Sequence, residues 1–431
     1  MAGLSTRRRS RVLLGVAASA VLVTTSACTS SEDTPAETGQ PVSPPAVELA
    51  PEGVPDDVSI GVVVSLTSAP GEGAQWNEAA EGARVAAYRY GLGDLDVTLV
   101  PRDDQGTADG ADAAVRELAE EGVSGIVMAT EGKHVTGALD AASELGVPVL
   151  LPYADTLADA PEGVWTTGAD AGQVSTTLTA ALESAGVSRP AVVDAGGTPI
   201  DLDEAGTLTL RPGGNAAGLA TRIANLARSA ARADSVVVTG PAALQAQMVQ
   251  ALQERNIALP VFLTGDAVSP AFAQALDENG ASLSAPLTTA GLDTDDVAAL
   301  APGTEGAAVS AYLAALRVTA EDGDVTDFFD EEKFETVAGA ADARSHDAVV
   351  ALVTAAAAAG SAEPAEVRDA LAGLTPDASD GLAGPALDFS SPTAVSSDAV
   401  VSLQATTQDP GLRPVDLAGA PRLYWFESPT A

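Results

Sequence analysis

The sequence predicts an α/β fold made of two doubly wound parallel-sheet lobes joined by hinge crossovers. Three observations lead to this prediction. Short β-rich runs alternate with alanine-rich amphipathic runs along most of the chain, and the pattern restarts after residue 168. Strand-like runs then return near the C-terminus, which indicates that the chain crosses back between the lobes. Strict alternation of strands and helices favours parallel sheets with right-handed crossovers.

The first lobe starts with VSIGVVV (58–64), an apolar run typical of a strand that is buried on both faces. The runs that follow show either the same short apolar pattern or apolar residues at helical spacing. We expect further strands at 96–100, 123–129 and 147–152, and helices at 79–90, 110–121 and 134–145.

The second lobe repeats the alternation, starting with a helix. We expect helices at 171–186, 216–232 and 242–256, and strands at 189–194, 207–211, 235–240 and 259–265. Later elements are helices at 305–320 and 346–360 and strands at 399–405 and 422–427. We therefore assign 58–168 with about 290–383 to the first lobe, and 169–289 with about 384–431 to the second.

The first 27 residues have the pattern of a secretory signal. Four arginines between residues 7 and 11 precede an apolar run (12–23) that is shorter than the roughly 20 residues of a spanning helix. The stretch TSAC (25–28) resembles the lipobox of bacterial lipoproteins, which implies cleavage before Cys28 and diacylation of its thiol. Cys28 is the only cysteine, so it has no partner for a disulfide within one chain. The alternative is an ordinary signal peptide with a chance cysteine.

Residues 28–57 then hold the lipidated Cys28 and a disordered tether. The stretch 29–55 contains six prolines and few residues that could pack in a core. This organisation predicts a protein that is anchored by lipid to the extracytoplasmic face of the cell membrane. No later segment has the apolar length of a membrane span.

The composition excludes some partners. Asp and Glu number 60 against 21 Lys and Arg, which gives a net charge of −39. A chain this acidic is not expected to bind nucleic acid, which requires neutralisation of phosphates. Solubility is the simplest use of such acidity, and a preference for cationic ligands is the alternative.

The fold places a ligand site at a definite edge of each sheet. In open parallel sheets, ligands bind outside the carboxyl ends of the strands. The residues that follow the expected strands are therefore the first candidates: Ser65–Pro70, Ala129–His134, Tyr153–Thr156, Asp194–Thr198, Gly240–Ala242 and Gly265–Ala267.

Several of these stretches resemble the periplasmic-binding-protein type I family. The likeness covers about 58–427 and rests on the order of pieces such as VSIGVVVSLTSAPGEGAQWNEAAEGARVA, GVPVLLPYADT and FLTGDAV. It is strongest to the branched-chain-amino-acid-binding proteins of ABC importers. The resemblance implies a receptor that closes on an amino acid or similar small polar ligand and delivers it to an ABC permease in the membrane.

The family's ligand contacts transfer to this sequence only in part. Asp266 falls where the family often has an acidic partner for the ammonium group, and its alternative role is a helix N-cap near Ser269. Tyr153 and Asp155 fall in a segment that supplies a carbonyl and a hydroxyl. Asp155 is a poor substitute for the family's threonine, because a carboxylate would repel the ligand's α-carboxylate.

Other positions bring further alternatives. Gly132 falls where a serine hydroxyl is expected, and Thr130 would supply the hydroxyl if the register slips by two residues. Trp76 lies near a position where an aromatic residue closes the cleft, and core packing is its alternative. The family's helix after 189–194 is missing, because AGGTPIDLDEAG (195–206) leads almost directly to the next strand.

Residues for catalysis or metal binding are scarce. The sequence has two histidines and one cysteine, and it lacks the H-E-x-x-H, G-x-S-x-G and Walker A patterns. His134 is either a pocket contact or, more simply, a solvated first-turn histidine, and His346 is expected to cap or pack. The pair Asp103–Asp104 is expected to cap a helix or mark the hinge side.

We therefore expect a monomeric solute-binding lipoprotein that is not an enzyme, with no catalytic residue, cofactor or metal. The alternative is a cell-envelope lipoprotein that uses the same fold for sensing or protein contacts without transport.

Overall fold

The structure is a computed structural model that describes residues 46–69, 71–154, 160–197, 199–200, 202–281, 286–292, 296–414 and 422–428. These residues belong to one compact unit, Pro44–Ala431. The expected signal, Cys28 and the tether up to residue 45 lie outside the described residues, as does Asp155.

The first sheet has five parallel strands in the order β2-β1-β3-β4-β5. They are β1 (Ser59–Val64), β2 (Thr98–Asp103), β3 (Gly125–Met128), β4 (Val149–Leu151) and β5 (Val164–Thr166). All four strands expected from the sequence are present, and β5 is an addition. The strands β1, β3, β4 and β5 are almost wholly buried, as expected when helices cover both faces of a parallel sheet.

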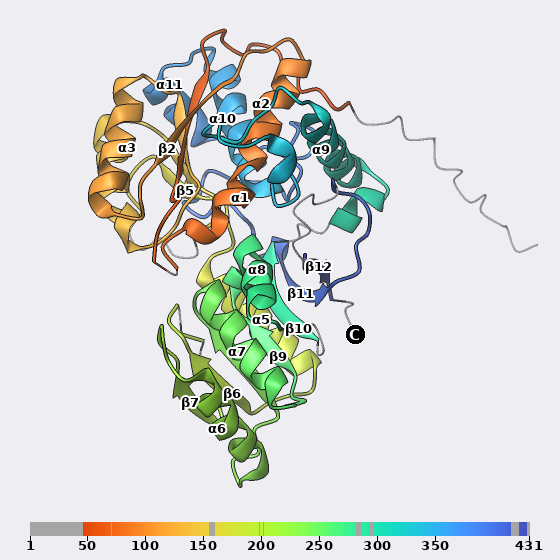
Figure 1. Ribbon diagram of the computed structural model, residues 1–431. Coiled ribbons are helices and arrows are strands. Elements are labelled where there is room, and N and C mark those ends of the chain that lie inside the picture. Colours follow the sequence, from red (N-terminus) through yellow and green to blue (C-terminus); the bar gives the residue numbers. More distant parts are fainter. Residues whose placement is uncertain are drawn as a thin grey trace, which may run out of the picture. The chain divides into compact units, whose positions relative to one another are not determined.

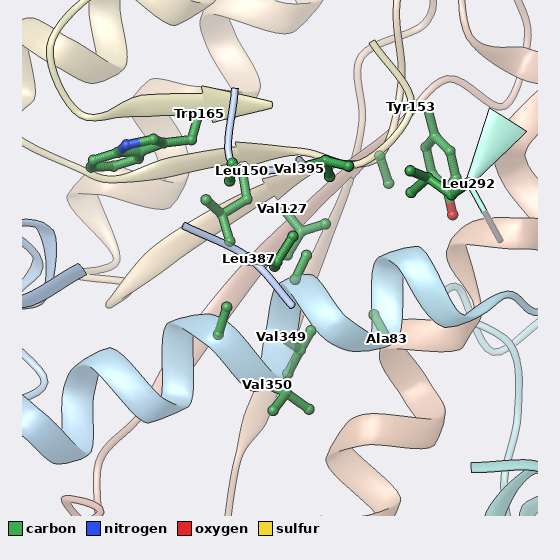
Figure 2. Packing of buried hydrophobic residues seen from close by; sticks show 14 of the residues in the cluster. Ala83, Val127, Leu150, Tyr153, Trp165, Leu292, Val349, Val350, Leu387 and Val395 are labelled. Atoms are coloured by element: carbon green, nitrogen blue, oxygen red, sulfur yellow. The ribbon is translucent and has the colours of Figure 1, made fainter. Parts of the chain in front are cut away.

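Helices cover both faces of this sheet, as Figure 1 shows. One face packs on α3 (Ala108–Glu120) and α4 (Thr136–Leu145), and the other packs on α2 (Gly82–Leu92), α10 (Ala343–Ala359) and α11 (Pro364–Leu371). The helix α9 (Thr304–Glu321) packs outside α2. In Figure 2, Val349 and Val350 of α10 lie below Val127 and Leu150 of the sheet.

Local signals explain where these helices begin and end. Thr107 accepts a hydrogen bond from the Gly110 amide and so caps α3. Asp342 caps α10 by accepting from the amides of Arg344 and Ser345, and Gly360 ends that helix in the left-handed region with φ of 63°. The expected role of Asp103 and Asp104 as helix caps is wrong, because Thr107 caps α3.

The second sheet has seven strands in the order β12-β11-β10-β9-β8-β6-β7. They are β6 (Pro190–Asp194), β7 (Gly206–Thr209), β8 (Ser235–Thr239), β9 (Val261–Leu263), β10 (Leu287–Leu292), β11 (Val400–Thr406) and β12 (Tyr424–Glu427). The five strands β6, β7, β8, β9 and β10 are parallel to one another. The strands β11 and β12 join antiparallel at one edge of this sheet, whose other five strands are parallel as the sequence predicted.

Helices also cover both faces of the second sheet. Alternate side chains of β6, β8 and β9 contact α6 (Ala216–Arg228), α7 (Ala242–Glu254) and α8 (Pro270–Glu278) on one face. The opposite face packs against α5 (Ala171–Ser184). This helix starts at a capping box formed by Asp170 and Gln173.

The segment 195–205 joins two parallel neighbours, β6 and β7, without a helix in its described residues. The sequence predicted that the family's helix is missing between these strands, and the described residues confirm this prediction. Ile200 and Leu202 of this segment pack against the same hydrophobic cluster as α5. The two side chains therefore cover part of the sheet face that a crossover helix would cover.

No single helix among the described residues has the length and apolar composition needed to cross a membrane. Taken together, α10 and α11 have the length and apolar composition of a membrane span, but the two helices are bent by 102° relative to each other.

Candidate functional site

A cleft of about 650 Å³ lies between the carboxyl ends of the strands of both sheets. Its walls come from the loops after β1, β3 and β4 of the first sheet and after β6, β8 and β9 of the second. Representative lining residues are Glu72, Gly132, Tyr153, Gly197, Pro241 and Asp266. Clefts of about 300 to 1,000 Å³ are the usual size for small-molecule sites. The cleft therefore lies where the strand order predicted a ligand site.

The first-sheet wall carries a stacked aromatic pair. Trp76 ends the short helix η1 (Ala74–Trp76), and Tyr153 follows β4. Their ring centroids are 4.7 Å apart and their planes differ by 6°. Trp76 lines the cleft, but it is only 2% exposed and also belongs to the hydrophobic core. Both roles considered for it from the sequence, cleft lining and core packing, therefore describe its position. The indole Nε1 of Trp76 donates to Glu131 Oε1 at 2.8 Å, which fixes the ring.

Arg344 lies over this aromatic pair and lines the cleft. Its guanidinium carbon is 4.5 Å from the Trp76 ring centroid and 4.6 Å from that of Tyr153. Asp342 holds the guanidinium through Nε at 2.8 Å and Nη2 at 2.7 Å. The Tyr153 hydroxyl donates to the other oxygen of Asp342 at 2.9 Å. The cap of α10 therefore positions both an aromatic ring and a cation in the cleft.

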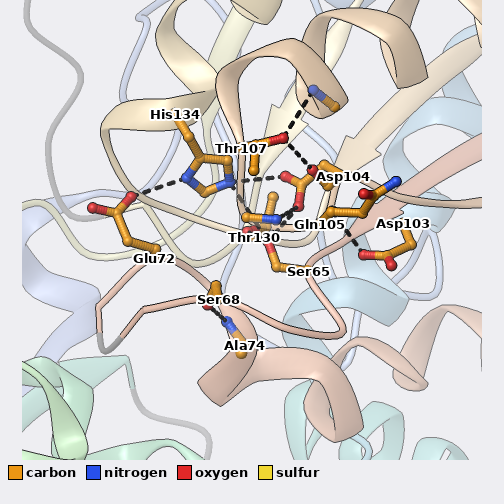
Figure 3. A network of polar contacts seen from close by, with 12 residues as sticks. Ser65, Ser68, Glu72, Ala74, Asp103, Asp104, Gln105, Thr107, Thr130 and His134 are labelled. Carbon is orange, nitrogen blue, oxygen red and sulfur yellow. Dashed lines mark hydrogen bonds and ion pairs between the residues drawn. The ribbon is translucent and has the colours of Figure 1, made fainter.

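A buried polar network supports the loop after β1 (Figure 3). The His134 Nε2 lies 2.8 Å from Asp104 Oδ2, and its Nδ1 lies 3.0 Å from Glu72 Oε2. Ser65 donates to Asp104 Oδ1 at 2.6 Å. Burial lowers the pKa of His134, but the hydrogen bonds to Asp104 and Glu72 outweigh burial and raise the pKa above its ordinary value. The His134 imidazole thus links Asp104, which follows β2, to Glu72 in the cleft wall.

His134 itself does not line the cleft. It is 7% exposed, and the description as a solvated first-turn histidine is wrong. Its partner Asp104 is fully buried. His346 is also buried, and its Nδ1 lies 2.7 Å from Asp347 while Arg89 donates to its Nε2. His346 therefore packs within the core of the first lobe, as the sequence predicted.

Asp266 and Gly132 face the cleft from opposite walls. Asp266 lies in the short helix η3 (Gly265–Val268) after β9 and is half-buried. Its backbone carbonyl accepts from the Ser269 amide at 3.1 Å and from the Ser269 hydroxyl at 2.7 Å. Ser269, and not Asp266, occupies the N-cap position of α8, so the alternative role of Asp266 as the N-cap is wrong.

Thr130 is not brought into the cleft. It is fully buried, and its hydroxyl lies 2.7 Å from the hydroxyl of Ser65. Gly132 does line the cleft, with a φ of 122° that side chains rarely adopt. Neither residue therefore presents a hydroxyl to the cleft, and Asp155 lies outside the described residues.

Arg344 was not predicted from the sequence. The candidates expected from the sequence all lie after strands, whereas Arg344 lies in the first turn of a helix far along the chain. The signal was present in DARSHD (342–347), where an aspartate N-cap precedes an arginine by two residues. Ile200 was also missed, and it lines the cleft from the segment that replaces the crossover helix.

The described residues contain no group of three or more His, Cys, Asp or Glu side chains that could hold a metal ion. The walls combine acidic side chains, two basic ones and many apolar ones. Such a cleft can hold a small solute with charged groups and an apolar body.

Residues 57–404 match the family model described as periplasmic binding protein. No curated protein matches the chain. A solute-binding protein of an ABC transporter from Rhodopseudomonas palustris BisB5, in complex with 3,4-dihydroxybenzoic acid, aligns with a TM-score of 0.61 at 16% identity over 87% of this chain and 97% of its own.

Two further solved structures show the same fold. The branched-chain amino acid transporter substrate-binding protein LivJ from Streptococcus pneumoniae, in complex with isoleucine, has a TM-score of 0.59 at 15% identity over 86% of this chain and 99% of its own. The leucine-binding protein LivK from Thermotoga maritima has a TM-score of 0.57 at 15% identity, over 82% of this chain and 96% of its own.

Proposed function

Because the chain belongs to the periplasmic binding protein family, we propose that it is an extracytoplasmic, lipid-anchored receptor that delivers a small solute to an ABC importer. The cleft between the two sheets is the observation that supports this function most directly. It has the volume of a small-molecule site and lies where such ligands bind in parallel sheets. The family and fold are those of solute-binding proteins that are not enzymes, and we propose the same for this chain.

The proposed ligand is an amino acid or a similar small polar molecule. Arg344 and Lys133 line the cleft together with acidic side chains that include Asp266. Both groups of a zwitterion would therefore meet an opposite charge, through charge-assisted hydrogen bonds. The solved structures with bound isoleucine and 3,4-dihydroxybenzoic acid support ligands of this size that carry a carboxyl group.

A thermal-shift screen of residues 29–431 tests the proposal. The panel contains amino acids, aromatic acids, amides, polyamines and sugars. A specific ligand at 100 times its Kd adds about 2.7 kcal/mol of stability, which raises the melting temperature measurably. A folded protein that responds to no member of the panel would contradict the proposal.

Asp266→Ala tests the ammonium contact that we propose for this side chain. Loss of a charge-assisted hydrogen bond is expected to weaken the binding of amino acids by about 1.5–3 kcal/mol. Binding of the matched acids that lack the ammonium group should change little. The measurement is isothermal titration calorimetry, and equal losses for both ligand types would contradict the role.

Cys28→Ala tests the proposed lipid anchor. Two acyl chains give stable membrane attachment, with about 0.8 kcal/mol for each buried CH₂ group, whereas an unacylated tether gives none. We expect the variant in the soluble extracytoplasmic fraction and the unmodified protein in the membrane fraction. Retention of the variant in the membrane would contradict the anchor.

A second candidate function is a cell-envelope lipoprotein that uses the fold for sensing or protein contacts without transport. The lack of a crossover helix among the described residues between β6 and β7 favours it, because that helix would have formed part of the second-sheet wall. The same ligand screen separates the two functions when combined with an uptake assay in the producing cell. Ligand binding without uptake would favour the second. For both functions we propose a monomer.

A further inference from the structure

The guanidinium of Arg344 has one hydrogen-bonding edge engaged and one edge available. Asp342 takes the edge formed by Nε and Nη2. Within the part of the chain that the structure describes, no other side chain hydrogen-bonds this guanidinium. A guanidinium has five N–H donors in a rigid fork, so the edge formed by Nη1 and Nη2 remains for an acceptor in the cleft.

Arg344 is held rigidly in place. Asp342 is fixed by its bonds to the first amides of α10 and by the Tyr153 hydroxyl. The rings of Trp76 and Tyr153 support the guanidinium face, and the Arg344 side chain is only 15% exposed. A cation that is already oriented and partly desolvated loses little entropy when it binds a ligand.

The rest of the cleft offers a carboxylate few alternatives. Lys133 is the other basic residue among the described lining residues, and it is exposed. The acidic lining residues would repel an anion. These are Glu72, Glu131, Asp140 and Asp266. Thr130 directs its hydroxyl to Ser65, and His134 is already engaged by two carboxylates.

We propose that Arg344 binds the carboxylate of the ligand through its Nη1–Nη2 edge, beside the Trp76–Tyr153 pair. The inference rests on the proposed solute-binding function and narrows its ligand to small organic carboxylates, including amino acids. The apolar lining residues, such as Leu139, Val174 and Leu292, would contact the body of such a ligand. An uncharged carboxamide analogue would meet the same walls without the bidentate ion pair.

Matched acids and amides test the proposal. The probes are leucine with leucinamide, phenylalanine with phenylalaninamide, and benzoate with benzamide, titrated into residues 29–431 by calorimetry. We expect at least one acid to bind more tightly than its amide. Arg344→Gln should weaken that acid by roughly 10- to 150-fold and leave the amide nearly unchanged. Arg255→Gln, which removes an exposed cation that does not line the cleft, is the control and should change the acid by less than about threefold.

The ratio of acid to amide affinity separates binding from structural damage. Loss of the Arg344–Asp342 pair alone would lower the melting temperature and weaken both probes of a pair equally. Arg344→Lys keeps the charge without the fork and should restore only part of the ratio. Binding of acids with an unchanged ratio in Arg344→Gln would overturn the carboxylate role but leave the proposed function intact. A protein that binds none of these acids but binds another member of the screening panel would overturn the carboxylate role alone, and a folded protein that binds no member of the panel would overturn both.

Discussion

At the scale of single residues, Glu81 is a buried carboxyl group that makes stability depend on pH. It is 4% exposed, its Oε1 accepts from the Phe328 amide at 2.9 Å, and its Oε2 has no hydrogen-bond partner among the residues that the structure describes. Burial raises its pKa from 4.5 to about 8. The folded state therefore holds a proton that the unfolded state has lost between these two pH values.

The sign of the effect follows from this difference in bound protons. The stability contributed by the protonated group is fully present below pH 4.5 and is lost as the pH rises through about 8. We expect Glu81→Gln to reduce the loss of unfolding free energy between pH 6 and 9 by roughly 2 kcal/mol, because the amide never ionises. Urea unfolding at both pH values measures this loss. Glu120→Gln, at an exposed glutamate in α3, is the control, and equal pH slopes in all three proteins would contradict the prediction.

The positions of single residues also show how much of the site could be predicted from the sequence. Trp76, Gly132, Tyr153 and Asp266 all line the cleft, because loops after parallel strands meet at one edge. Thr130 lies after a strand too, yet its hydroxyl is used by Ser65. Which neighbour a buried hydroxyl contacts depends on packing, which residue spacing does not contain.

At the scale of elements, the segment 195–205 replaces a helix between β6 and β7. Ile200 and Leu202 are half-buried against the cluster that includes α5. We expect the double variant Ile200→Ala/Leu202→Ala to lower the unfolding free energy by about 2–4 kcal/mol, less than two full core truncations. Chemical denaturation measures this change.

A control variant shows whether the loss of stability comes from burial of the side chains or only from their hydrophobic character. Leu145 at the end of α4 is 45% exposed, and Leu145→Ala should cost less than about 0.5 kcal/mol. If the double variant costs no more than this control, the segment does not cover the sheet as described. Ligand affinity should also fall in the double variant, because Ile200 lines the cleft.

Elements with a continuous apolar run or clear helical spacing were predicted well, and two strands without such a pattern were not. The strands β1 and β8 are continuous apolar runs, and the helices α3 and α7 have clear helical spacing. In contrast, β5 has three residues, and β10 contains LTTAGL, whose glycine and threonines disguise a buried strand. Such strands are defined by their neighbours in the sheet, which lie far away in sequence.

At the scale of the whole molecule, residues near the C-terminus (412–414 and 422–428) contact α9, which packs outside α2, and also add a strand to the second sheet. Leu412 packs with α9 and its carbonyl accepts from Arg317. Arg413 pairs with Asp296 through two bonds of 2.6 and 3.0 Å and donates to the Gly339 and Ala341 carbonyls. The strand β12 then pairs with β11 of the second sheet. Leu412, Arg413 and β12 all lie beyond residue 404, where the family match ends.

The connection predicts that Arg413 restricts movement between the lobes. Asp296 and Arg413 are 10% and 15% exposed, so Arg413→Ala leaves a buried carboxylate unpaired at a cost of roughly 3 kcal/mol. Residues 29–431 contain no cysteine, so spin labels at Glu120→Cys and Arg228→Cys report one distance between the lobes. We expect Arg413→Ala to broaden the distribution of this distance, measured by double electron–electron resonance.

The double variant Asp296→Ala/Arg413→Ala separates the two effects of the ion pair. It should recover part of the lost stability, because no buried charge remains unpaired, but it should keep the broad distance distribution, because the connection is still absent. Arg255→Ala, at an exposed arginine after α7, should leave both measurements unchanged. A narrow distribution in both Arg413 variants would contradict the prediction. It would mean that the hinge crossovers alone set the angle between the lobes and that the contacts of Arg413 do not restrict it.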